Sequence, residues 1–185
     1  MASITRNISV GTRRWAPRLV ASALAGMIAA VPMAWVMRGL NRVLPVRKTS
    51  WLTRLFSLPP KQVTKRISRR AGVPWVTKPG RRWDSATWLA HLGYGAAAAS
   101  LYPVVTRPLP VPNIVRGMLF AIAVWAGSYL GWLPATNIMK PATRESARRN
   151  IVMIVSHLVW GALIGLLATN FSRRMSGPDG IHHNE

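Results

Sequence analysis

Residues 151–171 of the chain read IVMIVSHLVWGALIGLLATNF, a stretch with no Asp, Glu, Lys or Arg. The hydrocarbon core of a bilayer is about 30 Å thick, and roughly 20 apolar residues in a helix are needed to cross it. The stretch is long and apolar enough to do so. It therefore predicts a transmembrane helix.

Similar apolar windows cover residues 17–37, 85–105 and 114–133. Arg18 lies at the edge of the first window and Arg116 near the start of the third, where a long basic side chain can reach the headgroups. The four windows predict an all-α, four-span helix bundle over residues 17–171, with an N-terminal tail (1–16), a basic loop (38–82) and a C-terminal tail (172–185). A cleaved signal peptide or a transit peptide is a weaker interpretation of the N-terminus, because its apolar run and basic character continue too far.

The chain is strongly basic: it has 25 Lys and Arg residues and 4 Asp and Glu residues, which give a formal net charge of +21. In a soluble chain this would favour nucleic-acid binding, but the apolar windows argue against that interpretation. Two loops on one side of the expected bundle hold 17 basic residues, and the middle loop and both tails hold 8. The positive-inside rule then predicts a cytoplasmic 38–82 loop and outside termini, although the Arg-bearing N-terminal tail argues the other way.

The basic loop has its own pattern. Residues 51–56 form a short amphipathic piece, and Pro59-Pro60 starts a segment in which Val63 and Ile67 are four apart, before Gly72. This pattern predicts a short helix on the anionic leaflet, although an ordinary positive-inside loop is the alternative. The residues expected to meet lipid headgroups are Arg54, Lys61, Lys65, Arg66, Arg69 and Arg70.

Two segments of the chain resemble each other. His91–Ala96 reads HLGYGA and His157–Ala162 reads HLVWGA, and a candidate helix N-cap, Asp84 or Asn150, precedes each histidine by seven residues. A weaker match joins residues 26–28 to 117–119. The pattern predicts a duplicated two-helix hairpin, with copies related by an axis along the membrane normal.

Small residues at helical spacing predict close helix contacts in the bilayer. The residues expected to pack in this way are Gly26, Gly95, Gly127, Gly131, Gly161 and Gly165.

Intramembrane polar groups are the candidates for function. His91 and His157 lie inside their predicted spans, where ionisable side chains usually face the bundle interior. They could bond the helices together, relay protons or recognise a ligand. A metal site is disfavoured, because the chain has no Cys and the two histidines provide too few ligands. The candidate polar site comprises His91, Tyr94, His157, Trp160 and Asp84.

Known catalytic and cofactor motifs are missing from the sequence. We therefore expect no enzyme activity, no metal and no cofactor. The leading expectation is a structural or accessory subunit that binds a membrane-protein partner or a second copy of itself. The alternative is a small transporter or channel that uses the histidine pair.

Several segments resemble a family of uncharacterised bacterial membrane proteins, the YagU-like group. They are residues 59–64, 91–102, 125–134, 148–150 and 157–161. The most specific is the 125–134 segment, WAGSYLGWLP. The resemblance covers about residues 18–170 and implies residence in the bacterial inner membrane.

Overall fold

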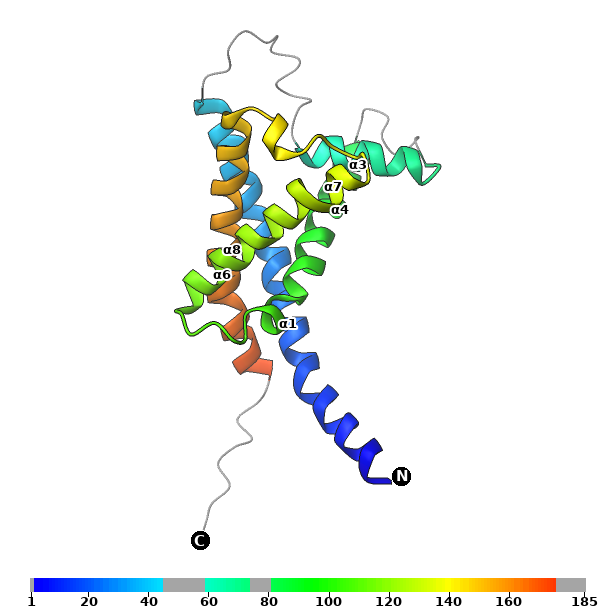
Figure 1. The fold of residues 1–185 in the computed structure, drawn as a ribbon, viewed down its shortest axis with the longest axis vertical. Coiled ribbons are helices and arrows are strands. Elements are labelled where there is room, and N and C mark those ends of the chain that lie inside the picture. The colour runs from blue at the N-terminus through cyan, green and yellow to red at the C-terminus, as the bar shows by residue number, and fades with distance from the viewer. Residues whose placement is uncertain (1, 45–58, 74–80, 176–185) are drawn as a thin grey trace.

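The computed structural model describes residues 2–44, 59–73 and 81–175, which form helices and turns without a β-strand. The elements are α1 (Ala2–Val43), α3 (Pro59–Arg70), α4 (Arg81–Ser100), α5 (Tyr102–Val105), α6 (Asn113–Ala126), the π-helix η2 (Gly127–Trp132), α7 (Leu133–Ala135), the 3₁₀ turn η3 (Ala142–Arg144) and α8 (Ala147–Met175). Figure 1 shows the long helices side by side, with α3 lying across one end.

The expected all-α fold is confirmed, and each expected window lies in a helical segment. Three segments are long and apolar enough to cross a membrane, namely Trp15–Val43, Asn113–Ala135 and Ala147–Met175. The α4 segment is not among them, because it begins with Arg81, Arg82 and Asp84 and also contains His91, which lower its mean hydropathy. The α1 helix begins at Ala2, so residues expected as an N-terminal tail are helical.

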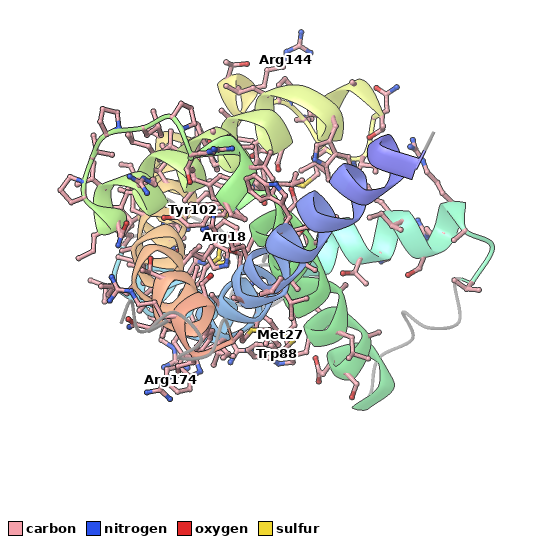
Figure 2. The ribbon with its side chains drawn as sticks, turned by 90° about the horizontal axis from the view of Figure 1, so that it is seen from below. Arg18, Met27, Trp88, Tyr102, Arg144 and Arg174 are labelled. Carbon is pink, nitrogen blue, oxygen red and sulfur yellow. The ribbon has the colours of Figure 1, made fainter. Side chains whose placement is uncertain are left out.

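The long helices pack in the spatial order α4, α1, α8, α6, with α1 against both α4 and α8, and α8 against both α1 and α6. Figure 2, which looks along the long axis, shows α1 between α4 and α8. Fully buried alanines of α1 (Ala25 and Ala29) and the aliphatic Ile164 of α8 belong to the main apolar core. The start of α1 and the end of α8 lie at the same end of the bundle, opposite α3, as Figure 1 shows.

Glycines set two close helix crossings. A methyl group at Gly26 of α1 would collide with the carbonyl of Gly95 on α4. A methyl group at Gly117 of α6 would collide with the carbonyl of Gly161 on α8. Backbones approach this closely only where neither residue has a side chain, as is typical of helix pairs in membranes.

Gly165 also packs as expected, because a methyl group there would collide with the backbone of Asn113. Gly127 and Gly131 differ from the prediction. They are exposed, and a methyl group on either would meet nothing within 4 Å. Since α6 contacts α8 through the face that carries Gly117, these two glycines face outward.

Helix α3 is the helix expected within the basic loop. It begins at Pro59 and ends at Arg70, and the next turn is closed by a hydrogen bond from Val73 N to the Ser68 carbonyl, at 3.0 Å. Gly72 stands in the left-handed conformation with φ 72°, which glycine adopts without strain. The amphipathic piece expected at residues 51–56 and the predicted headgroup residue Arg54 lie outside the described residues.

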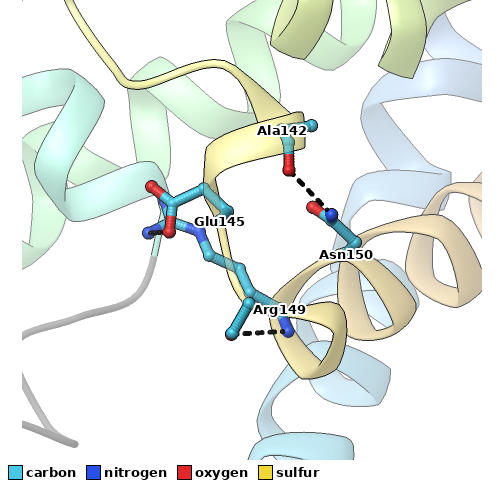
Figure 3. A network of polar contacts seen from close by, with 5 residues as sticks. Ala142, Glu145, Arg149 and Asn150 are labelled. Carbon is cyan, nitrogen blue, oxygen red and sulfur yellow. Dashed lines mark hydrogen bonds and ion pairs between the residues drawn. The ribbon is translucent and has the colours of Figure 1, made fainter.

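The helix starts differ from the two predicted caps. Helix α8 begins at Ala147, and Ser146 acts as its N-cap by accepting a hydrogen bond from Arg149 N at 3.3 Å. Asn150 instead lies in the first turn and donates to the Ala142 carbonyl at 2.8 Å (Figure 3). Asp84 lies in the first turn of α4, which begins at Arg81. In both segments the helix extends further toward the N-terminus than the apolar pattern indicates.

Candidate functional site

A cavity of about 620 Å³ lies between α4 and the α6–η2 segment. Its walls come from α1, α4, α6, η2, α7 and α8, and residues of α3 cover one end. The cavity exists because α4 and α6 do not pack closely, whereas α1 and α8, on the other side of the bundle, do. The two predicted histidines and both predicted aromatic residues line it.

His91 enters this cavity from α4. Its Nε2 lies 3.2 Å from the carbonyl oxygen of Ala30 on α1, so the side chain also links these two helices. The ring of Trp88 lies edge-on to the imidazole, with ring centroids 6.2 Å apart. The hydrogen bond and the ring contact fix the orientation of the imidazole at the cavity wall.

His157 enters the same cavity from α8 and is buried. Its Nδ1 bonds the Met153 carbonyl of its own helix at 2.7 Å. The rings of Tyr129 and Trp160 stand edge-on to the imidazole, each with a centroid separation of 6.3 Å. The histidines therefore share one cavity but bond to different carbonyls.

Trp160 of α8 joins the second half of the chain, which holds α6 and α8, to the first half, which holds α1 and α4. Its indole Nε1 donates a hydrogen bond to the Gly26 carbonyl on α1 at 2.9 Å, and its ring stacks on Phe120 of α6 with centroids 6.1 Å apart. The side chain is 3% exposed. It therefore forms a fixed part of the cavity wall.

Tyr94 reaches across the cavity to the other half of the chain. Its hydroxyl lies 2.6 Å from Ser128 Oγ on η2, and its ring lies 6.3 Å from that of Trp132. These contacts join α4 to η2 along the seam where the helices do not pack closely. We call the line of contact between α4 and η2, marked by Tyr94, Ser128 and Trp132, the lateral seam.

Asp84 was expected to join the polar site, but it does not line the cavity. It is exposed, and it borders a separate recess at the start of α4 together with Trp88 and Leu89. The first turn of a helix favours an acidic side chain electrostatically, which accounts for Asp84 without a role in the cavity.

Helix α3 meets the turn that follows α7 through arginines. Arg66 donates to the carbonyl of Ile138, and Arg70 to that of Thr136. These guanidinium groups, for which contact with lipid headgroups stays a prediction, are exposed and also bond protein carbonyls. The reason is the turn at Asn137, with φ 53°, which leaves carbonyls directed toward α3.

The other headgroup candidates keep an outward position where their side chains are described. Lys65 and Arg69 are exposed on α3, and Lys61 lies in its first turn. Val63 packs under the helix against the apolar cluster of Leu133, Ile138 and Met139. The apolar face of α3 therefore covers the cavity, and Lys65 and Arg69 lie away from that face.

The loop before α8 is tied to the end of α1 by Arg148, which donates to the carbonyls of Leu44 at 3.0 Å and Asn41 at 2.8 Å. Arg149 pairs with Glu145 at 3.2 Å, as Figure 3 shows. These contacts hold the α1 and α8 ends together beside α3. None of the described residues that line the cavity below them is Lys or Arg.

Ser128 and the covering face of α3 are the site features that the sequence analysis missed. The segment around Ser128, GSYLGW, was noted only for family resemblance and for small residues. In the structure this segment is the π-helix η2. A π-helix has a wider turn than an α-helix and is frequent at functional sites.

The three long apolar helices fit a multi-pass integral membrane protein. The family described as "Protein of unknown function (DUF1440)" matches residues 31–166, and the chain belongs to this family. The matched range contains both histidines and all the described residues that line the cavity except Ala30. No curated protein and no solved structure matches the chain.

Proposed function

We propose that the chain is a four-span protein of the bacterial inner membrane, a member of the YagU-like group, that binds a small molecule in the cavity between α4 and η2. The fourth span would be α4, whose 20 residues reach about 30 Å. Its close crossing with α1 at Gly26 and Gly95 supports this assignment, because α1 is apolar enough to cross the membrane.

We also propose that the two helix hairpins, α1 with α4 and α6 with α8, are copies of one unit, because corresponding glycines make the same contacts in both. In the alignment of the two copies, Gly26 corresponds to Gly117 and Gly95 to Gly161, and these are the pairs at the two crossings. The position four residues after each first glycine is an alanine, Ala30 or Ala121, whose Cβ meets the partner glycine. Equivalent residues thus make equivalent contacts within each hairpin.

The proposed orientation places α3 on the cytoplasmic side and both termini outside, supported by the 17 basic residues in the two loops at the α3 end. A reporter that is active only in the cytoplasm should work when fused after Gly72 and fail when fused at the C-terminus. The reverse pattern would invert the orientation.

Small-molecule binding is supported by one observation above all. A cavity of about 620 Å³ carries both histidines, and ligand sites usually measure roughly 300–1,000 Å³ with a few placed polar groups in an apolar wall. Among the functions expected from the sequence, this favours the small transporter or channel over a purely structural subunit. We propose no catalytic role.

Filling the cavity tests this function. Gly93 lines the cavity, and a methyl group there would meet nothing within 4 Å, so Gly93→Trp should place an indole inside without a backbone clash. Gly39→Trp is the matched control, because Gly39 is equally open but does not line the cavity. Lipids and small molecules that co-purify in mild detergent would be identified by mass spectrometry.

We expect one compound to be enriched with the wild type and the Gly39→Trp variant, and to be lost from the Gly93→Trp variant. Identical profiles for all three proteins would contradict binding in the cavity.

The accessory role is a second candidate, favoured by the outward face of η2. Gly127 and Gly131 are exposed, a methyl group on either would meet nothing within 4 Å, and Leu130 is exposed between them. A partner helix could approach closely there. Pull-down of the intact complex in mild detergent should then lose the partner, or a second copy of the chain, in Gly127→Trp but not in Gly39→Trp. Equal recovery from both variants would count against this role.

A further inference from the structure

The chemistry of the cavity wall restricts the charge of its ligand. Among the residues that the structure describes, none that lines the cavity is Asp, Glu, Lys or Arg, although the chain has 25 basic residues. A charged group in an apolar site without a partner of opposite charge is strongly disfavoured. The occupant that fits such a wall is uncharged.

The two histidines then define a polar feature of the ligand. A carbonyl oxygen can only accept, so Nε2 of His91 carries the proton in its bond to Ala30, and Nδ1 of His157 carries it in its bond to Met153. In a neutral imidazole the other nitrogen is an acceptor. The described residues provide no further hydrogen bond to His91 Nδ1 or His157 Nε2. A ligand that satisfies these nitrogens must carry a donor, such as a hydroxyl.

The position of the opening indicates where the ligand comes from. The lateral seam lies between α4 and η2, where Tyr94 is 43% and Trp132 is 39% exposed. Gly93 and Ala97 line the cavity and are also exposed. At this depth a four-span bundle is surrounded by lipid, so a molecule that enters through the seam is dissolved in the bilayer.

We infer that the cavity binds an uncharged, hydroxyl-bearing membrane lipid, which enters through the lateral seam and donates its hydroxyl to His91 or His157. The inference rests on the proposed function and names its ligand class.

The native chain has no cysteine, so a single introduced thiol can report occupancy. Ala90→Cys places the thiol on the cavity wall beside His91, and Leu89→Cys, exposed outside the cavity, is the control. The full-length protein in nanodiscs would be alkylated with a small maleimide at neutral pH. The probes, at equal mole fraction, are hexadecanol, its methyl ether, palmitate and hexadecylamine.

Hexadecanol should slow alkylation of the cysteine at position 90 and leave the one at position 89 unchanged. The methyl ether has the same chain but no donor, so it should bind roughly fivefold more weakly, the ratio for one net hydrogen bond. Palmitate and hexadecylamine, which carry charge, should protect least. Replacing the histidine that accepts the hydroxyl, His91 or His157, with Leu should remove the difference between the alcohol and its ether, and replacing both should remove it in either case. Ser156→Ala, a buried change outside the cavity, should preserve the difference.

The outcomes separate the two proposals. If no probe protects position 90, cavity binding itself is contradicted. If the ether or a charged probe protects as well as the alcohol, cavity binding stands and the hydroxyl-bearing class is overturned. The comparison of alcohol and ether in the Ala90→Cys protein decides this even if a histidine variant does not fold.

Discussion

The indole Nε1 of Trp160 donates a hydrogen bond to the carbonyl of Gly26, and the donor and acceptor lie 2.9 Å apart. Gly26 also forms the close crossing of α1 with α4, so one residue of α1 contacts both of its helical neighbours. The bond joins the first and second halves of the chain.

Trp160→Phe should therefore lower the stability of the bundle. Phe keeps an aromatic ring against Phe120 but loses the donor, and interhelical hydrogen bonds in membranes are worth about 0.6–2 kcal/mol. Thermal unfolding in nanodiscs would measure the loss. Trp35→Phe is the control, because Trp35 is 65% exposed. Equal thermal unfolding midpoints for Trp160→Phe and Trp35→Phe would show that the Trp160–Gly26 hydrogen bond contributes nothing to stability.

Gly161→Ala should destabilise the fold more than Gly127→Ala, the same change at an outward glycine. Its new methyl group would collide with the Gly117 carbonyl and the Ala121 Cβ, and overpacking of this kind costs about 1–3 kcal/mol. Gly127→Ala meets nothing within 4 Å and should be neutral or stabilising, because Ala is the better helix former. Denaturation of both variants in the same detergent would test the contrast, which fails if Gly161→Ala is tolerated equally.

Removing the two arginines that bond α3 to the turn after α7 should loosen both segments. In an Arg66→Ala, Arg70→Ala double variant, the carbonyls of Ile138 and Thr136 lose their donors. Backbone amides of α3 and of residues 136–139 should then exchange hydrogen faster. The Lys65→Ala, Arg69→Ala variant changes two exposed basic residues on the same helix and should leave exchange unchanged. Similar exchange in both variants would mean that the apolar contact of Val63 alone holds α3.

The sequence was sufficient for the helical class and for the positions of the long helices, because apolar length and helix termination are local properties. It also brought His91 and His157 to attention, since polar groups inside apolar windows are costly. The hydrogen bonds between α3 and the turn after α7 could not be predicted from the sequence in the same way. A basic helix on a membrane surface and one bonded to a protein turn have the same composition, and only the carbonyls near Asn137, far along the chain, distinguish them.

The glycines show the same limit. Small residues at a spacing of four predict close approach but not which helix face meets a neighbour. Gly161 lies at a crossing, whereas Gly127 faces outward, because α6 contacts α8 with the face of Gly117. The cap at Ser146 was missed because polar residues that precede an apolar window can still be helical, as Asn150 is.

The Tyr94–Ser128 bond should control access through the lateral seam. The two hydroxyls are 2.6 Å apart and join helices that otherwise pack loosely, so Tyr94→Phe and Ser128→Ala should each weaken the seam. If the hydroxyls act as a pair, the double variant should lose less stability than the two single losses combined, with a coupling of about 0.6 kcal/mol.

In the Ala90→Cys background, either change should also speed alkylation at position 90, because the seam opens more often. Thr169→Val, which removes a hydroxyl bonded within α8 and away from the cavity, should change neither the coupling nor the rate. Strictly additive losses, together with unchanged alkylation in both seam variants, would show that the bond does not gate the cavity.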